Sequence, residues 1–241
     1  MTQTARRPVF PEQMRIISGS GLKMIAVICM LIDHIGVHLL NNTTGKTILF
    51  RLAGTDYTLY RVSRDIGRIA FPIFCFLLIE GFTYTHSRLS YARNLLLFAL
   101  ISELPWNYVH DGRWFGYGKQ NVCFTLLLGY LGCWAIEYFR EQQLLQIGCV
   151  LALLAVSFRL SADYGWRGYI FILIMYAFRY EAATQAIIGS CWLYYEWKAC
   201  FAFIPINLYN GKRGFIRGKW FKYAFYAFYP VHLMILALLK F

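Results

Sequence analysis

The chain has 241 residues, of which 59% are hydrophobic and 19% aromatic, and its mean hydropathy is +0.46. A soluble domain is much less apolar, so this composition indicates an integral membrane protein. The formal net charge is +12, but the basic residues are scattered between apolar runs, which excludes a nucleic-acid partner. Because one span with its connection takes roughly 25 residues, we expect an all-α bundle of about nine transmembrane spans, within a range of eight to ten.

Two regions follow from this pattern. Residues 1–21 are polar and basic and predict a cytoplasmic tail, whereas residues 22–241 predict a single transmembrane domain. With about nine crossings, the tail and the basic stretch 211–222 share one side, which the positive-inside rule assigns to the cytoplasm. Basic residues in the connection 41–66 argue for the opposite orientation. We predict a multi-pass protein of the bacterial cytoplasmic membrane with its amino terminus inside.

The first predicted span, residues 22–40, contains two ionisable residues, Asp33 and His34. A helix of this length covers roughly 28 Å, which is enough to cross a bilayer. An ionised side chain at its centre costs about 2.5 to 3.5 kcal/mol on insertion scales. Ionisable residues at this depth are typical of functional sites. The alternative is that Asp33 only caps or hydrogen-bonds a neighbouring helix.

The second and third predicted spans also hold charged residues. The second, residues 67–82, has Arg68 at one end and Glu80 about 18 Å further along the helix, so these two cannot pair. Each needs another partner or a ligand, although Arg68 can equally snorkel to the headgroups. The third span, residues 91–109, contains Glu103.

The later spans are less regular. A fourth and a fifth span are predicted at residues 121–138 and 144–158, and the sequence SADYGWRG at 161–168 predicts a loop or a re-entrant turn. Three apolar segments after it are too short for comfortable straight crossings, which favours tilted, merged or re-entrant helices. These segments are residues 169–178, 183–197 and 199–208, and a last span follows at residues 223–239.

Helix depth places four ionisable residues in one layer. Counted from the cytoplasmic side at about 1.5 Å per residue, Asp33 and His34 lie roughly 17 Å in, Glu103 roughly 18 Å, and His232 roughly 14 Å. Structural polar residues have no need to share a depth, so this layering favours a functional site near the midplane. On the outer side of the layer we expect Arg68, Asn121 and the loop 163–167.

The chemistry of this layer centres on histidine. A histidine beside a carboxylate is suited to removing a proton from a hydroxyl or an amine near neutral pH. His34 and His38 also have the i, i+4 spacing of a two-histidine metal pair. There is no HExxH sequence and Asp33 points to another side of the helix, so we predict no metal. The seven cysteines lack paired spacing, which argues against disulfides and a zinc site.

Six blocks along the chain carry a family resemblance. They are LKMIAVICMLIDHIG at 22–36, GRIAFPIFCFLLIEGF at 67–82, FALISELPWN at 98–107, NVCFTLLLG at 121–129, DYGWRG at 163–168 and FYPVHL at 228–233. Together these blocks resemble the TraX family of integral membrane proteins. More loosely, an Asp-His pair followed by an FPxFxF span is similar to the transmembrane acyltransferases, which include heparan-alpha-glucosaminide N-acetyltransferase and the acyltransferase 3 enzymes.

The resemblance implies an enzyme, because the plasmid-encoded namesake of the family is the conjugative F-pilin acetylase. It implies that acetyl-CoA is used from the cytoplasm and that an amine or hydroxyl acceptor is modified at or beyond the outer face. The expected acceptor is a peptide or pilin amino terminus, a glycan or another small molecule.

The residues and the resemblance together suggest roles. His34 is the predicted general base, oriented by Asp33 or Glu103. Arg68 and Asn121 are expected to hold the acyl carbonyl or the acceptor as an oxyanion forms. We expect direct transfer, with an acyl-histidine or acyl-cysteine step less favoured. The other predicted substrate-binding residues are Glu80, Asp163, Tyr164, Tyr229 and His232.

The basic stretch near the carboxyl terminus is the predicted site for the phosphates of the coenzyme. Clusters of Arg and Lys bind phosphate through charge-assisted hydrogen bonds. The alternative is that this stretch only obeys the positive-inside rule or attracts anionic lipid. The predicted cofactor-binding residues are Lys212, Arg213, Arg217 and Lys219.

A competing prediction is a proton-coupled membrane transporter of a small polar solute. Carboxylates near the midplane, the break at 163–168 and the short spans after it suit such a carrier. Against it, the sequence has no inverted repeat and no matched pair of interrupted helices. A third class, a non-catalytic assembly protein, leaves the charges inside the membrane unexplained.

Overall fold

The computed structural model describes residues 6–41, 44–52, 54–116, 118–216 and 218–240. Helices dominate it, as the sequence predicts, and a short antiparallel hairpin is the exception. In chain order the elements are η1 Glu12–Met14, α1 Gly19–His38, β1 Ile48–Leu52, β2 Thr55–Thr58, α2 Leu59–Gly67, α3 Ala70–Tyr84, α4 Arg88–Asp111, α5 Val122–Tyr138, α6 Gln143–Leu160, α7 Gly165–Ala177, α8 Ala182–Trp192, η2 Tyr194–Ala202, α9 Phe203–Asn207 and α10 Lys219–Lys240.

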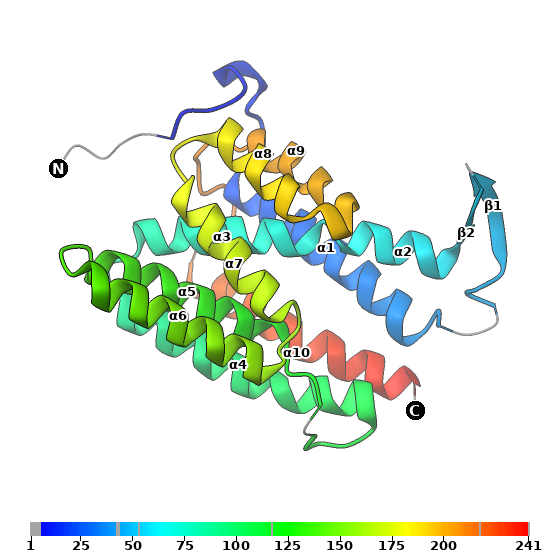
Figure 1. Ribbon diagram of the computed structural model, residues 1–241. Coiled ribbons are helices and arrows are strands. Elements are labelled where there is room, and N and C mark those ends of the chain that lie inside the picture. Colours follow the sequence, from blue (N-terminus) through cyan, green and yellow to red (C-terminus); the bar gives the residue numbers. More distant parts are fainter. Residues whose placement is uncertain (1–5, 42–43, 53, 117, 217, 241) are drawn as a thin grey trace.

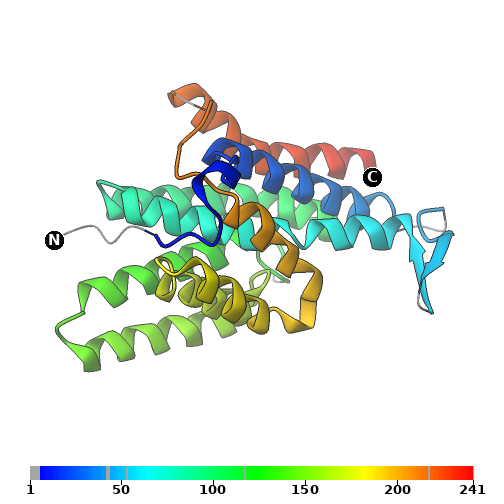
Figure 2. The ribbon, with the colours of Figure 1, turned by 90° about the horizontal axis from the view of Figure 1, so that it is seen from above.

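The helices run to and fro between two ends of one bundle (Figures 1 and 2). At the amino-terminal end, the backbone N–H of Gly19 donates to the carbonyl of Lys212 at 2.8 Å, and Arg88 forms an ion pair with Glu137. The opposite end, which we call the hairpin end, contains the β1–β2 hairpin and the last residues of α1, α4 and α10, and α6 ends on the way towards it. There, the Lys240 ammonium donates to the carbonyl of Val109 at 2.7 Å.

Four helical segments are long and apolar enough to cross a membrane. A fifth, Val122–Tyr138, is apolar but shorter. Length and composition therefore support a helical membrane protein, while the count of nine spans and the orientation of the amino terminus stay predictions. The four segments are Gly19–His38, Leu59–Tyr84, Gln143–Leu160 and Tyr223–Lys240.

The connection between the first two predicted spans is more ordered than the sequence analysis expected. It contains the β1–β2 hairpin, in which Arg51 pairs with Asp56, and then α2. The side chain of Thr58 caps α2 by accepting from the backbone N–H of Arg61 at 3.1 Å. As a result, the second long segment begins at Leu59, well before the predicted residue 67.

The carboxyl-terminal third is irregular, as the sequence predicts, and the structure narrows the bounds of the predicted break. The segments 183–197 and 199–208 are not straight helices, because α8 ends at Trp192 and the backbone is non-helical at Glu196, with φ −128° and ψ 50°. The predicted break is confined to residues 161–164, since α7 already begins at Gly165.

Two packed clusters hold the bundle together. The larger lies mainly between α1, α3, α5, α7 and the η2–α9 segment, and the smaller lies between α4 and α10. Tyr229 and Leu233 of α10 are buried in the smaller cluster, at 5% and 0% exposure. The burial of this face of α10 brings the neighbouring residue His232 against α1.

Candidate active site

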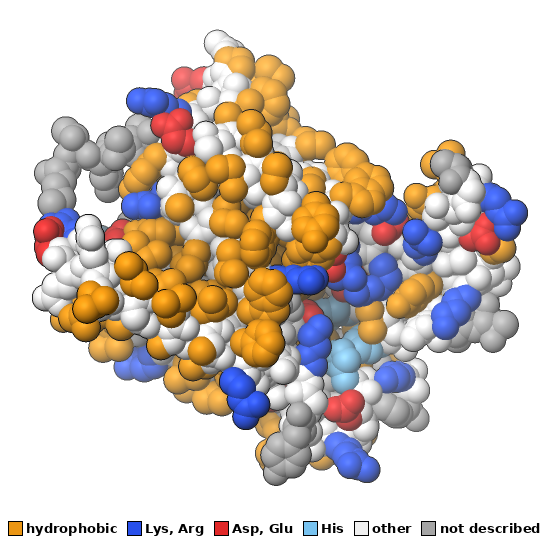
Figure 3. Space-filling view, in the orientation of Figure 1, with side chains coloured by type: hydrophobic (Ala, Val, Ile, Leu, Met, Phe, Trp, Pro, Cys, Tyr) orange, Lys and Arg blue, Asp and Glu red, His pale blue; other side chains and the backbone are white. Residues whose placement is uncertain are grey.

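A cavity of about 750 Å³ opens at the hairpin end of the bundle. Figure 3 shows it as a hollow with histidine at its base and basic and acidic side chains around it. Of the predicted site residues, the cavity brings together Asp33, His34, Arg68, Asp163 and Tyr164. Further charged or histidine residues in its lining are His38, Arg64, His110, Lys119, Arg167 and Glu196.

His34 is bound to His232. His34 Nδ1 lies 2.6 Å from His232 Nε2, and the two rings stack with centroids 4.9 Å apart. His232 Nδ1 lies 2.7 Å from the backbone carbonyl oxygen of Phe228, one turn earlier in α10. His232 is only 4% exposed, so this arrangement is held inside the packed region.

These contacts fix the protons of the neutral pair. A carbonyl oxygen only accepts, so His232 Nδ1 must donate to Phe228, and His232 Nε2 is then an acceptor. His34 Nδ1 must therefore carry a proton and donate it to His232. His34 Nε2 keeps its lone pair, and His34 lines the cavity. This tautomer is the one that a general base facing a substrate requires.

Asp33 is paired with an arginine that sequence analysis did not select. Arg64 Nη1 of α2 donates to Asp33 Oδ2 at 2.6 Å, and their side chains are only 23% and 19% exposed. Among the described residues, neither Asp33 nor Glu103 forms the hydrogen bond that orients His34, because His232 occupies that position. The sequence analysis expected a carboxylate beside His34, but the structure has His232 in that position.

Two glycines bring α1 and α2 close enough for this ion pair. A Cβ atom at Gly67 would lie 2.1 Å from Asp33 Oδ1, and a Cβ at Gly36 would lie 2.1 Å from Ser63 Oγ. Small residues at such crossings allow helix backbones to approach closely in membrane proteins. The close crossing places Arg64 beside the cavity.

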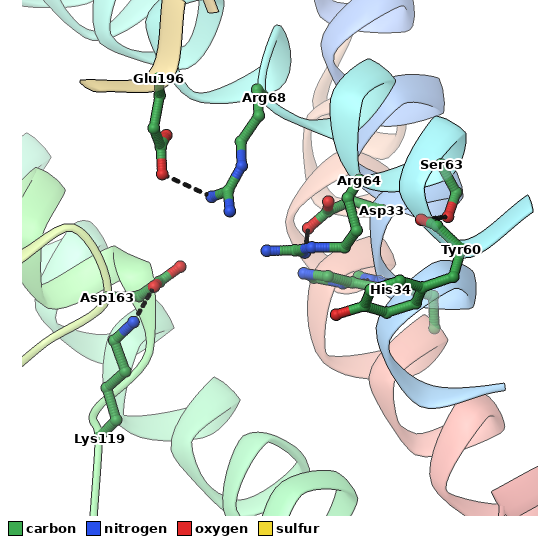
Figure 4. A network of polar contacts seen from close by, with 10 residues as sticks. Asp33, His34, Tyr60, Ser63, Arg64, Arg68, Lys119, Asp163 and Glu196 are labelled. Atoms are coloured by element: carbon green, nitrogen blue, oxygen red, sulfur yellow. Dashed lines mark hydrogen bonds and ion pairs between the residues drawn. The ribbon is translucent and has the colours of Figure 1, made fainter. Parts of the chain in front are cut away.

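Two other ion pairs lie across the cavity from His34 (Figure 4). Arg68 Nη1 is 2.9 Å from Glu196 Oε1, and Lys119 Nζ is 2.6 Å from Asp163 Oδ1. These pairs connect α2, η2, the segment before α5 and the turn before α7. Charged residues from distant parts of the chain therefore meet around one polar space.

The turn before α7 is held in a strained conformation. Ser161 and Tyr164 have positive φ angles of 52° and 61°, which residues other than glycine rarely adopt. Tyr164 stacks on Phe71 with ring centroids 3.7 Å apart, and Thr125 Oγ1 donates to the Asp163 carbonyl at 2.5 Å. These contacts keep Asp163 and Tyr164 in the cavity wall.

The comparisons with known proteins show the family of this chain. The family model described as TraX protein matches residues 18–240, which is most of the chain. The chain belongs to the TraX family. A relative from Dichelobacter nodosus, described as probable fimbrial assembly protein FimC of serogroup H1, is 28% identical over 252 residues, covering 92% of this chain and 96% of the relative. No solved structure matches the chain.

Other predicted site residues of this TraX-family chain have structural contacts outside the cavity lining. Asn121 is fully buried at the start of α5, where its Oδ1 accepts from the N–H of Cys123 at 2.9 Å. Its Nδ2 donates to Glu103 Oε2 at 2.5 Å and to the Ala99 carbonyl at 2.9 Å. Asn121 and Glu103 thus join α4 to α5. Tyr229 packs beside His34, with ring centroids 6.1 Å apart.

Glu80 and the basic stretch lie towards the other end of the bundle. Glu80 is next to Tyr209 and Arg6, and Arg6 also donates to Gln185 Oε1 at 3.0 Å. Through their carbonyls, Lys212 and Arg213 accept from the first N–H groups of α1. Arg217 lies outside the described residues, and nothing is described of the Lys219 side chain.

A second pair of histidines lines the cavity and was not predicted as part of the site. His38 and His110 meet edge to face at 4.7 Å, and His110 Nδ1 lies 2.8 Å from the Trp106 carbonyl. In the described part of the chain, no group of three or more His, Cys, Asp or Glu residues is arranged to hold a metal ion.

Proposed function

We propose that this protein is an integral membrane acetyltransferase that moves the acetyl group of acetyl-CoA to a hydroxyl or amine acceptor. The observation that supports it best is the hydrogen bond from His34 to His232, which leaves the lone pair of Nε2 unused on a residue that lines a polar cavity. Membership of the TraX family is consistent with this activity.

In the proposed reaction, His34 Nε2 removes the proton of the acceptor O–H or N–H group. The acceptor atom attacks the thioester carbonyl, the new O–C or N–C bond forms, and the C–S bond breaks as the tetrahedral intermediate collapses. The departing CoA sulfur takes a proton from the His34 imidazolium and leaves as the thiol. The histidine returns to its neutral form, so protons balance over one turnover.

Two guanidinium groups are suited to stabilise the negative charge of the intermediate. Arg64 and Arg68 both line the cavity, four residues apart in sequence. Each is held by a carboxylate, Asp33 for Arg64 and Glu196 for Arg68, so each is oriented before the substrates arrive. This assigns to Arg64 part of the role that the sequence analysis gave to Asn121.

The coenzyme phosphates are proposed to bind at the amino-terminal end, near Lys212 and Arg213. This end is separated from His34 by about 22 Å along α1, counted from Gly19 at 1.5 Å per residue. His34 itself lies only about 6 Å before the end of α1 at His38. The proposed donor and acceptor therefore approach from opposite ends, with the donor side in the cytoplasm.

The relative's link to fimbrial assembly supports an acceptor that belongs to the cell surface. We propose that this acceptor is a peptide amino terminus or a glycan at the bacterial cytoplasmic membrane, surrounded by lipid.

The test is to supply purified protein in vesicles with acetyl-CoA and host membrane extract, and to measure free CoA thiol and acetylated product. We expect both products from the wild type and neither above background from His34→Ala. Transport of an unmodified solute without thiol release would contradict the proposal and favour a carrier.

A further inference from the structure

The helix α6 has the most exposed apolar surface among the candidate spans. Its mean hydropathy is 1.8, yet only 6% of it is buried inside the protein, and Ser157 is its one buried residue. An apolar helix of this length with little protein around it faces lipid in a membrane. Its exposed apolar residues include Leu144, Leu145, Ile147, Leu151, Val156 and Phe158.

The lipid-facing surface of α6 continues into the cavity. Ser157, Phe158 and Ser161 line the cavity, and Phe158 is also 68% exposed to the surroundings. Figure 3 shows the hydrophobic surface extending up to the Lys and Arg side chains that border the hollow. A hydrocarbon chain lying along α6 can therefore reach Phe158 in the cavity lining, next to these basic side chains.

The mouth of the cavity lies at the level expected for lipid headgroups. Arg159 is exposed in the last turn of α6, and Trp166 is 36% exposed at the start of α7. Arginine near the end of a span extends to the headgroups, and tryptophan concentrates at the same boundary. A molecule held there would have its chain in the bilayer and its polar head at the cavity.

The charges of the cavity favour a head with a negative group. Each of its three carboxylates pairs with a cation, whereas Arg167 has no ion pair within the described ranges. The guanidinium of Arg167 lies over the rings of Tyr195, at 4.7 Å, and Trp166, at 5.4 Å. Such a planar group suits bidentate binding of a phosphate.

We infer that the acceptor is a lipid-borne amphiphile that enters the cavity sideways from the bilayer beside α6. Its chain lies against Phe158, a phosphate that joins chain and head contacts Arg167, and a hydroxyl of the head reaches His34. This inference rests on the proposed acetyltransferase function and, of the two acceptors proposed above, selects the glycan, as the head of a lipid-borne molecule. The hydroxyl oxygen forms the new ester bond, the thioester C–S bond breaks, and the proton passes through His34 to the CoA thiol.

The first test follows the acetyl group without requiring the identity of the acceptor. Membranes containing the full-length protein are incubated with acetyl-CoA radiolabelled in the acetyl group and then extracted with chloroform and methanol. We expect His34-dependent label in the organic phase. Label confined to protein or to water-soluble glycan would overturn the lipid-borne acceptor while leaving acetyl transfer intact. Absence of label from every fraction would overturn the proposed function itself.

The second test locates the entrance. Phe158→Ser is expected to lower the rate of lipid labelling by about tenfold, the scale of a lost apolar contact with substrate. Leu145→Ser is the matched control, since Leu145 is also exposed on α6 but lies about 20 Å away along the helix. Equal rates for the two variants would overturn the entrance beside α6.

A third variant tests the phosphate contact. Arg167→Gln is expected to raise the KM for the acceptor lipid, which is purified as the labelled product of the first experiment and deacetylated before use. Arg113→Gln, on the α4–α5 connection, is the control. An unchanged KM for Arg167→Gln would overturn the placement of the phosphate.

Discussion

His34 and His232 are 198 residues apart in sequence, yet His34 Nδ1 and His232 Nε2 lie 2.6 Å apart in the fold. The first and last long helices of the chain therefore complete the site together. The carbonyl of Phe228 fixes the tautomer of His232, and His232 fixes that of His34. In the proposed reaction, this chain of hydrogen bonds takes the orienting task that a carboxylate performs beside histidine in many hydrolases.

Replacing His232 separates its positioning role from simple packing. We expect His232→Leu to lower kcat by about 10- to 100-fold, the usual effect of removing a group that orients a functional histidine. His232→Gln should recover part of this loss, because its amide oxygen can accept from His34 Nδ1. The measurement is kcat across pH for both variants. Equal losses for Leu and Gln would indicate that only the volume of His232 matters.

The Asp33–Arg64 pair predicts a non-additive stability effect. Asp33→Ala alone leaves a partly buried guanidinium without its partner and should lower the free energy of unfolding by about 3 kcal/mol. The double variant Asp33→Ala with Arg64→Met removes both charges, so it should be more stable than Asp33→Ala. Denaturant unfolding in detergent compares the single and double variants. Additive losses would show that the two residues do not interact.

The α1–α2 crossing depends on the missing side chain of Gly67. Gly67→Ala places a methyl group against Asp33 Oδ1 and should lower the Tm and the transfer rate together. Gly148→Ala is a matched control, because no atom outside its own helix surroundings lies within 4 Å of a Cβ at that position of α6. Its Tm should be unchanged or slightly higher. A stable, active Gly67→Ala protein would show that the crossing tolerates expansion.

The basic stretch predicts a selective effect on the donor. Neutralising Lys212, Arg213, Arg217 and Lys219 to Gln should raise the KM for acetyl-CoA, while kcat at saturation changes little. Arg140→Gln, on the exposed turn after α5, is the comparison because it tests another basic residue on the α5–α6 connection. If Arg140→Gln raised the KM for acetyl-CoA and the four-residue variant did not, the phosphates would bind at that turn and not at the basic stretch.

The candidate-site residues that lie within or beside apolar segments could be predicted from the sequence. Asp33 and His34 stand out because charge inside a long apolar helix is costly. Arg68, Asp163 and Tyr164 flank apolar segments at their ends, and all three line the cavity. A charged or polar residue within or beside an apolar segment can be recognised from one sequence alone.

The missed residues depend on contacts that one sequence does not specify. Arg64 belongs to α2, which was interpreted as a polar connection, although its four-residue spacing from Arg68 places both on one helical face. Glu196 reaches the cavity because the backbone departs from helical angles at that residue. The sequence analysis named Asp33 or Glu103 as the partner of His34 and did not identify His232 in that position, since depth alone leaves the rotation of each helix open. Asn121 caps α5 outside the cavity lining, and a helix cap cannot be told from a substrate ligand in one sequence.

His34 is the proposed base for acetyl transfer, and a comparison of the wild type with His34→Ala tests this role. Wild-type and His34→Ala proteins, reconstituted in equal amounts into vesicles made from host lipid and membrane extract, are given acetyl-CoA radiolabelled in the acetyl group. Binding of acetyl-CoA and the Tm of both proteins are recorded as controls. We expect label covalently retained by an acceptor with the wild type, and a rate lower by about 100-fold or more with His34→Ala at similar stability and donor binding. Equal rates of labelling by the two proteins would contradict it.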